Sequence, residues 1–161
     1  MTGDSGAAGV RSPFDFERWA VSRINARPNV KQVGDKGVDG VARFYLDKKT
    51  SGKILVSVKG GANVGPQFVR DLLGTLDTQK AQMGVLILMA KPTKGIADAV
   101  AHGGTYTWPV NHLTFPRVQV VTVEELLAGK RPDMPSTLTP YTMAIKAVPE
   151  AVQLNLNELA G

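Results

Sequence analysis

Hydrophobic residues recur along this chain at spacings that change from three or four residues to two and back. Residues 14–26 carry apolar side chains on one helical face, and residues 68–76 repeat that pattern. Between them lie two short runs, 38–46 and 53–58, which are rich in valine, isoleucine and aromatics and are bounded by glycine and polar clusters. Such runs are typical of paired strands. We therefore expect a helix, a β-hairpin and a second helix, in that order.

The second half of the chain alternates between strand and helix patterns. The continuous apolar run 85–89 is typical of a central strand that is covered on both faces. Thr93 then precedes a predicted helix, and a strand at 118–121 leads into Thr122 and Glu125, which have the spacing of a capping box. This order predicts an α/β sandwich whose mixed sheet is antiparallel in its first half and built from βαβ units in its second.

The length of 161 residues indicates one domain. We expect a flexible lead at 1–12, the folded domain at 13–130 and a proline-containing C-terminal extension at 131–161. No run of about 18 apolar residues exists, so no membrane partner is expected. The absence of cysteine excludes thiolate metal sites and fits a cytoplasmic location. The net charge of +5 permits a polyanion partner, although a mildly basic surface would give the same value.

Three ionisable residues are placed to meet at one edge of the predicted sheet. Asp39 lies near the start of the first hairpin strand and Lys59 at the end of the second, so antiparallel pairing brings them together. Glu17 falls inside the apolar arc of the first helix, where a carboxylate needs a partner or a metal. The pattern predicts a metal-and-phosphate site. The alternatives are an ordinary ion pair at the sheet edge and a Glu17 that pairs with an arginine.

Glu17, Asp39 and the tripeptide Ser57-Val58-Lys59 occur in the order found in the PD-(D/E)xK nucleases, and the chain resembles their Mrr-type restriction endonuclease branch. It looks most like the endonuclease-like domain at the C-terminus of many bacterial site-specific DNA methyltransferases. The blocks that carry this resemblance are FERWAV, GDKGVDG, ILVSVKGG, VRDLLGTL, GVLILMAKPT and PRVQVVTVEELLAGKRPDMP. They span about residues 13 to 135 and imply a restriction-endonuclease-like three-layer sandwich, with a central mixed sheet flanked by helices.

The resemblance implies a Mg²⁺-dependent DNA endonuclease of restriction type, with Glu17, Asp39 and Lys59 as catalytic residues. Asp39 would ligate Mg²⁺ or Mn²⁺, the carbonyl of Val58 would be a second ligand, and Glu17 would add a ligand directly or through water. Lys59 would orient or activate the attacking water. These roles agree with the preference of Mg²⁺ for one or two carboxylates together with waters and phosphate oxygens.

One position departs from that superfamily, which usually has Glu, Asp or Gln where this chain has Ser57. A hydroxyl is a poorer Mg²⁺ ligand than a carboxylate, so one negative charge is missing unless Glu17, Asp35 or Gln67 compensates. Serine here also looks normal for the methyltransferase-linked group. The alternative function is therefore a catalytically weak or inactive DNA-binding or accessory domain of a restriction-modification methyltransferase.

DNA is the expected partner under either function, together with a methyltransferase domain or subunit and, for double-strand cutting, a second copy of the chain. Free N–H groups at a helix start suit phosphate, and basic turn residues can follow a phosphate backbone. The candidate DNA-contacting residues are Lys36, Lys48, Lys49, Gln67 and Arg70. Taken singly, such residues are more often simply part of a solvated surface. Residues 103–114 are expected to form a loop, although Tyr106 and Trp108 could stack on a base.

Overall fold

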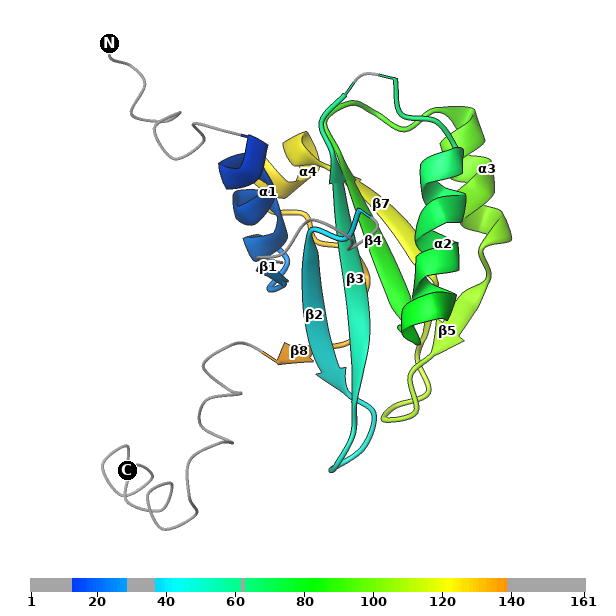
Figure 1. Cartoon of the computed structure of the whole chain (residues 1–161). Coiled ribbons are helices and arrows are strands. Elements are labelled where there is room, and N and C mark those ends of the chain that lie inside the picture. The colour runs from blue at the N-terminus through cyan, green and yellow to red at the C-terminus, as the bar shows by residue number, and fades with distance from the viewer. Residues whose placement is uncertain (1–12, 29–36, 62, 139–161) are drawn as a thin grey trace, which may run out of the picture.

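A mixed sheet between two layers of helices forms the body of the molecule in the computed structural model (Figure 1), which describes residues 13–28, 37–61 and 63–138. The helices are α1 (Pro13–Ser22), α2 (Gln67–Gln79), α3 (Lys94–His102) and α4 (Val123–Leu127). The strands of the main sheet are β1 (Arg27–Pro28), β2 (Gly40–Tyr45), β3 (Ser51–Lys59), β4 (Met83–Leu88), β7 (Val118–Thr122) and β8 (Thr137–Leu138). Strands β5 (Thr105–Thr107) and β6 (Thr114–Pro116) form a separate two-stranded sheet.

The main sheet has the strand order β1-β2-β3-β4-β7, and β8 pairs with β2. Strands β2 and β3 form the predicted antiparallel hairpin, in which Gly40 lies opposite Val56 and Tyr45 opposite Ser51. Strand β4 runs parallel to both β3 and β7, and all six of its residues are buried. The prediction of a mixed α/β sandwich is therefore confirmed. The unbroken apolar run of β4 follows from its position, because a strand covered on both faces has no side chain in water.

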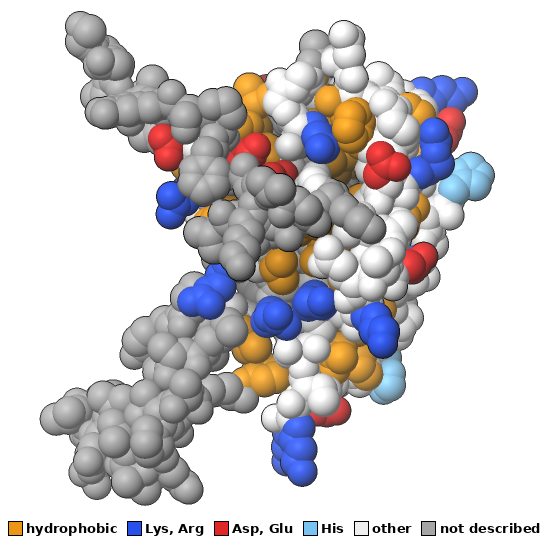
Figure 2. Space-filling view, viewed as in Figure 1, with side chains coloured by type: hydrophobic (Ala, Val, Ile, Leu, Met, Phe, Trp, Pro, Cys, Tyr) orange, Lys and Arg blue, Asp and Glu red, His pale blue; other side chains and the backbone are white. Residues whose placement is uncertain are grey.

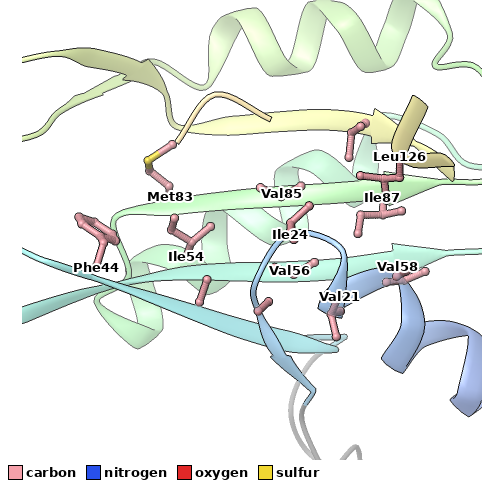
Figure 3. Packing of buried hydrophobic residues seen from close by; sticks show 14 of the residues in the cluster. Val21, Ile24, Phe44, Ile54, Val56, Val58, Met83, Val85, Ile87 and Leu126 are labelled. Atoms are coloured by element: carbon pink, nitrogen blue, oxygen red, sulfur yellow. The ribbon is translucent and has the colours of Figure 1, made fainter. Parts of the chain in front are cut away.

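Side chains of alternate strand residues point to opposite faces and build two cores. Helices α1 and α4 pack on one face, here called the α1 face, and α2 and α3 pack on the other, the α2 face. Figure 3 shows the core of the α1 face. Its labelled residues are Val21, Ile24, Phe44, Ile54, Val56, Val58, Met83, Val85, Ile87 and Leu126. The core of the α2 face is centred on Leu55, Val69, Leu72, Leu86 and Ile96.

Two glycines in the strands allow the helices to approach the sheet closely. A Cβ atom on Gly84 of β4 would lie 3.0 Å from the Cγ atom of Leu72 in α2. A Cβ atom on Gly40 of β2 would lie 2.9 Å from the Cβ atom of Val21 in α1. Any side chain at either position would therefore crowd a residue of the facing helix, which would have to shift.

The chain after α1 differs from the prediction of a helix that extends to residue 26. The helix ends at Ser22 because Asn25 adopts a left-handed conformation with φ of 62°, and the Ala26 N–H then donates to the Val21 carbonyl at 3.0 Å. Asparagine is one of the few residues that enter this conformation readily. The predicted strand at 29–33 lies outside the described residues.

The expectation of a plain loop at 103–114 is wrong, because β5 and the start of β6 lie there. The rings of Tyr106 and Trp108 pack edge-on against Phe44, with ring centroids 5.9 and 6.2 Å away. The Trp108 Nε1–H also donates to the Tyr45 carbonyl at 2.6 Å. These two aromatics therefore cover Phe44 at the border of the α1-face core, and they are packing residues.

Residues 131–138, the first part of the predicted C-terminal extension, pack on the sheet. The side chain of Gln119 makes two hydrogen bonds with the backbone of Asp133, one of them from the Asp133 N–H at 2.8 Å. Pro135 is buried, and β8 then pairs with β2. Across the described parts of the chain, none of the helices has the length and apolar content needed to cross a bilayer.

We predict that Phe44→Ala lowers the free energy of unfolding by about 3–5 kcal/mol, because Phe44 is fully buried and supports both hairpin aromatics. Urea denaturation followed by circular dichroism measures the loss. Leu127→Ala, at a position 65% exposed, is the control and should change the free energy by less than about 0.5 kcal/mol. Equal losses in the two variants would contradict this account of the core.

Candidate functional site

Asp39 is fixed where the β2 strand leaves the ladder with β3. Its N–H donates to the Val56 carbonyl at 2.8 Å, as the last backbone bond at this end of the hairpin. Its Oδ2 atom then accepts from the Val58 N–H at 2.7 Å, so a side-chain oxygen takes the place that a backbone carbonyl would occupy in a longer strand. The carboxylate is thereby held beside the C-terminal end of β3, at the end of the sheet where β2 begins.

Glu17 reaches this carboxylate from α1. Its side chain is half-buried, as its place inside the apolar arc predicted, and it makes a hydrogen bond with Asp39. The pKa of Asp39 is raised to about 6, first by burial and then by the charge and hydrogen bond of Glu17, against the opposing effects of the Val58 N–H and the Lys59 charge. A carboxyl group with this pKa carries a proton over part of the mildly acidic range.

Lys59 ends β3 close enough to Asp39 for its charge to lower the pKa of that carboxyl group. Its ammonium lies 4.9 Å from the centroid of the Phe68 ring, a cation–π geometry, and next to Gly37, whose φ is +80°. The structure therefore brings Glu17, Asp39 and Lys59 together at one edge of the sheet, as their positions in the chain predicted. Their catalytic roles stay predictions.

Ser57 lies on the α2 face and is only 5% exposed. Its hydroxyl donates to the Gly37 carbonyl at 2.8 Å, which fixes the chain that leads into β2. Ser57 and Lys59 line one wall of a cavity of about 190 Å³, whose opposite wall comes from α2. The hydroxyl of Ser57 is thus committed to the backbone of its own protein, and the cavity beside it leaves room for a longer side chain.

The described oxygen donors do not fit the Mg²⁺ centre that the nuclease resemblance implies. Asp39 uses one carboxylate oxygen on the Val58 N–H, and Ser57 offers a hydroxyl that is already bonded. In the segments 13–28, 37–61 and 63–138, no group of three or more His, Cys, Asp or Glu residues could hold a metal ion. Asp35, which might have compensated, lies outside these segments, and Gln67 is exposed at the start of α2.

The predicted DNA-contacting residues do not form one surface. Gln67 and Arg70 are exposed in the first turn of α2, near the Lys59 edge. Lys48 and Lys49 are exposed in the turn between β2 and β3, at the far end of a nine-residue strand that spans about 30 Å. Lys36 lies outside the described residues. Arg70 also lines a groove of about 480 Å³ between α2 and α3.

The sequence model of a family described as NACHT-associated inactive Restriction Endonuclease 1 matches residues 14–128, which is most of the chain. The chain belongs to this family. Neither a curated protein nor a solved structure matches the chain with significance. Membership in the NACHT-associated family supports the restriction-endonuclease-like fold, and the word inactive in its description agrees with a donor set that lacks a carboxylate at position 57.

The supporting residues of the site were not found from sequence. Phe68 was expected only as part of the apolar face of α2, and its contact with the Lys59 ammonium depends on how α2 packs. Gly37 was expected as a strand boundary, although its carbonyl is the acceptor for Ser57. The available signal for Phe68 was its position two residues after Pro66, a proline typical of a helix start, and nine residues after Lys59.

We predict that Asp39→Asn stabilises the metal-free protein at pH 7.5 by about 1–2 kcal/mol, a value reduced for partial exposure. The folded pKa of Asp39 is raised above its ordinary value of 3.8 to about 6. Its contribution to stability is therefore fully present below pH 3.8 and is lost as the pH rises through about 6. The variant should lack this loss, while its amide oxygen still accepts from the Val58 N–H.

Chemical denaturation in chelator between pH 4 and 8 measures this difference, with Asp98→Asn, at an exposed position of α3, as the control. A wild-type stability that rises from pH 4 to pH 7 relative to the Asp39→Asn variant would contradict the prediction.

Glu17→Gln should move the titration of Asp39, followed by NMR, to lower pH, because it removes both effects of Glu17 that raise the pKa.

Proposed function

We propose that this chain is a catalytically inactive, DNA-binding accessory module with the restriction-endonuclease fold. The observation that carries the proposal is the Ser57 hydroxyl, which donates to the Gly37 carbonyl at 2.8 Å where the nuclease superfamily places a metal-binding side chain. The family description, which contains the word inactive, points in the same direction.

Hydrolysis of a phosphodiester needs a metal that activates water and holds the transferring phosphate. Here Asp39 accepts a hydrogen bond from the backbone and shares another with Glu17, and Lys59 lies against the ring of Phe68. The same side chains that a nuclease would aim at substrate instead satisfy the backbone and one another. This arrangement supports a role for the cluster in holding the hairpin and α1 together.

DNA binding is proposed from the fold of the family and from the net charge of +5. The partner of the module is a further proposal. The Mrr-type resemblance and the six sequence blocks favour a methyltransferase domain or subunit, whereas the family description associates the domain with NACHT. A homodimer remains the expectation only if the chain engages both DNA strands symmetrically.

An active Mg²⁺-dependent restriction endonuclease is the second candidate. The observation in its favour is that Glu17, Asp39 and Lys59 lie together at one sheet edge. A centre with two carboxylates and one backbone carbonyl would hold Mg²⁺ weakly, since Mg²⁺ requires near-ideal octahedral oxygen geometry. Activity would then appear only with a metal that tolerates poorer ligands, which makes Mn²⁺ the discriminating condition.

We predict that the wild-type protein does not nick supercoiled plasmid, methylated or not, with either Mg²⁺ or Mn²⁺. Asp39→Ala and Lys59→Ala should behave identically to wild type in this agarose assay, because no hydrolysis depends on them. The wild type should still retard DNA, with an affinity that falls as salt rises. Metal-dependent nicking by the wild type that both variants abolish would establish the nuclease instead.

We predict that Ser57→Asp creates divalent-cation binding that the wild type lacks. The new carboxylate would stand beside the cavity next to Lys59, which has room for it. At a cation concentration of about ten times the dissociation constant, the expected stabilisation is about 1.4 kcal/mol, visible as a rise in melting temperature with Mn²⁺ or Mg²⁺. Ser51→Asp, an exposed position on the same strand, is the matched control. An equal cation response in both variants would contradict the prediction.

A further inference from the structure

Among the described residues, no helix covers the α2 face of the sheet at Arg43 and Lys53, where β2 and β3 approach their hairpin turn. Helix α2 packs against β4 and β7, and α1 lies on the other side of the sheet. Arg43 of β2 is directly opposite Lys53 of β3, and both residues fall at odd positions, which face the α2 side. Arg43 is exposed and Lys53 is half-buried. Two cations therefore stand side by side on an uncovered part of the sheet.

The charges of Arg43 and Lys53 repel each other, and no ion pair with a described carboxylate offsets this repulsion. Like charges directly opposite each other on antiparallel strands destabilise the pair of strands. Within residues 13–28, 37–61 and 63–138, neither Arg43 nor Lys53 forms an ion pair with a carboxylate, in contrast to Arg117, which pairs with Asp77, and Lys130, which pairs with Glu125. An anion from another molecule would remove the repulsion, so the pair marks a place that favours a negatively charged ligand.

Two more cations extend the pair into a row. Arg27 of β1 is exposed and pairs with Val41, which places it on the same face. At the other end, Lys80 follows α2 in a left-handed conformation, and its chain is tied to β3 by two hydrogen bonds between Gln82 and Lys53, at 2.7 and 3.1 Å. We call Arg27, Arg43, Lys53 and Lys80 the basic row. Figure 2 shows Lys and Arg side chains gathered across the lower half of this face.

We propose that the basic row binds the phosphodiester backbone of DNA. This inference rests on the proposed DNA-binding function and names the surface that performs it. Neighbouring strands lie about 4.8 Å apart, so charges on successive strands form a line. A line of cations on a flat sheet face matches a chain of phosphates, whereas a single phosphate ion would need donors that converge on one point.

The row is separate from the Glu17–Asp39–Lys59 cluster. Lys53 and Lys59 are six residues apart on β3, which is about 20 Å along the strand. DNA held on the basic row would therefore run across the opposite end of the sheet from the one where a nuclease would cut. Binding at this surface is compatible with a cluster that lacks a carboxylate at position 57, because neither site depends on the other.

The test compares three double variants of the full chain in fluorescence anisotropy with a labelled duplex of about 20 base pairs, between about 50 and 200 mM salt. Arg43→Ala/Lys53→Ala should weaken binding about tenfold or more at the lowest salt and reduce the slope of log affinity against log salt by about 2. Lys91→Ala/Lys94→Ala is the control. It removes two exposed charges near the other end of β4 and should bind within about threefold of wild type.

The third variant, Lys59→Ala/Arg70→Ala, probes the edge that carries the cluster. If it loses DNA affinity while Arg43→Ala/Lys53→Ala keeps it, the basic row is not the binding surface, although the proposed function stands. If the wild type itself does not bind the duplex at about 50 mM salt, the proposed DNA-binding function fails and the inference fails with it.

Folding is controlled by circular dichroism and by a variant that keeps both charges. Arg43→Ala/Lys53→Ala should melt no lower than wild type, because it removes a like-charge pair. Arg43→Lys should retain most of the affinity and the salt slope. A loss of affinity in Arg43→Lys as large as that in the double alanine variant would contradict a charge-based contact with the phosphate backbone.

Discussion

The organisation of the sheet edge depends on one hydrogen bond, from the N–H of Val58 to the carboxylate of Asp39. An unsatisfied buried N–H costs about 1–3 kcal/mol, and at this point β2 has already left the ladder. On the other face, the Ser57 hydroxyl satisfies the carbonyl of Gly37. Two side chains thus attach the segment before β2 to the end of β3. Positions that would bind metal in a nuclease form hydrogen bonds here that connect these two segments.

The cluster has the electrostatics of a metal site but lacks a carboxylate at position 57. Two carboxyl groups lie in contact in a partly desolvated place, and the lysine beside them lies over an aromatic ring. In a nuclease a divalent cation would neutralise such a pair. In this domain the backbone N–H of Val58, the charge of Lys59 and, in mild acid, a proton share that task. The restriction-endonuclease-like fold is held by the two hydrophobic cores on either side of the sheet.

Sequence periodicity predicted the elements whose apolar residues pack locally, and capping chemistry placed Thr93 and Thr122, whose side chains accept the expected helix N–H bonds. Antiparallel pairing sufficed to bring Asp39 and Lys59 to one edge. The β5–β6 hairpin escaped prediction because it lacks a short turn signature and is stabilised by Phe44, about sixty residues away. The Arg43–Lys53 pair and the partner of Ser57 depend on strand register, which spacing alone does not specify.

The hydrogen atom on the α-carbon of Gly84 sets the distance between α2 and the sheet. Phe68, in the first turn of α2, lies against the Lys59 ammonium, and Lys80, which follows the last turn, belongs to the basic row. A methyl group at position 84 would lie 3.0 Å from side-chain carbons of Leu72, in the middle of this helix, so Leu72 and the helix that carries it would have to give way by a few tenths of an ångström. Because Phe68 and Lys80 stand at the two ends of this helix, any shift of the helix itself would reach both surfaces, although residue 84 touches neither.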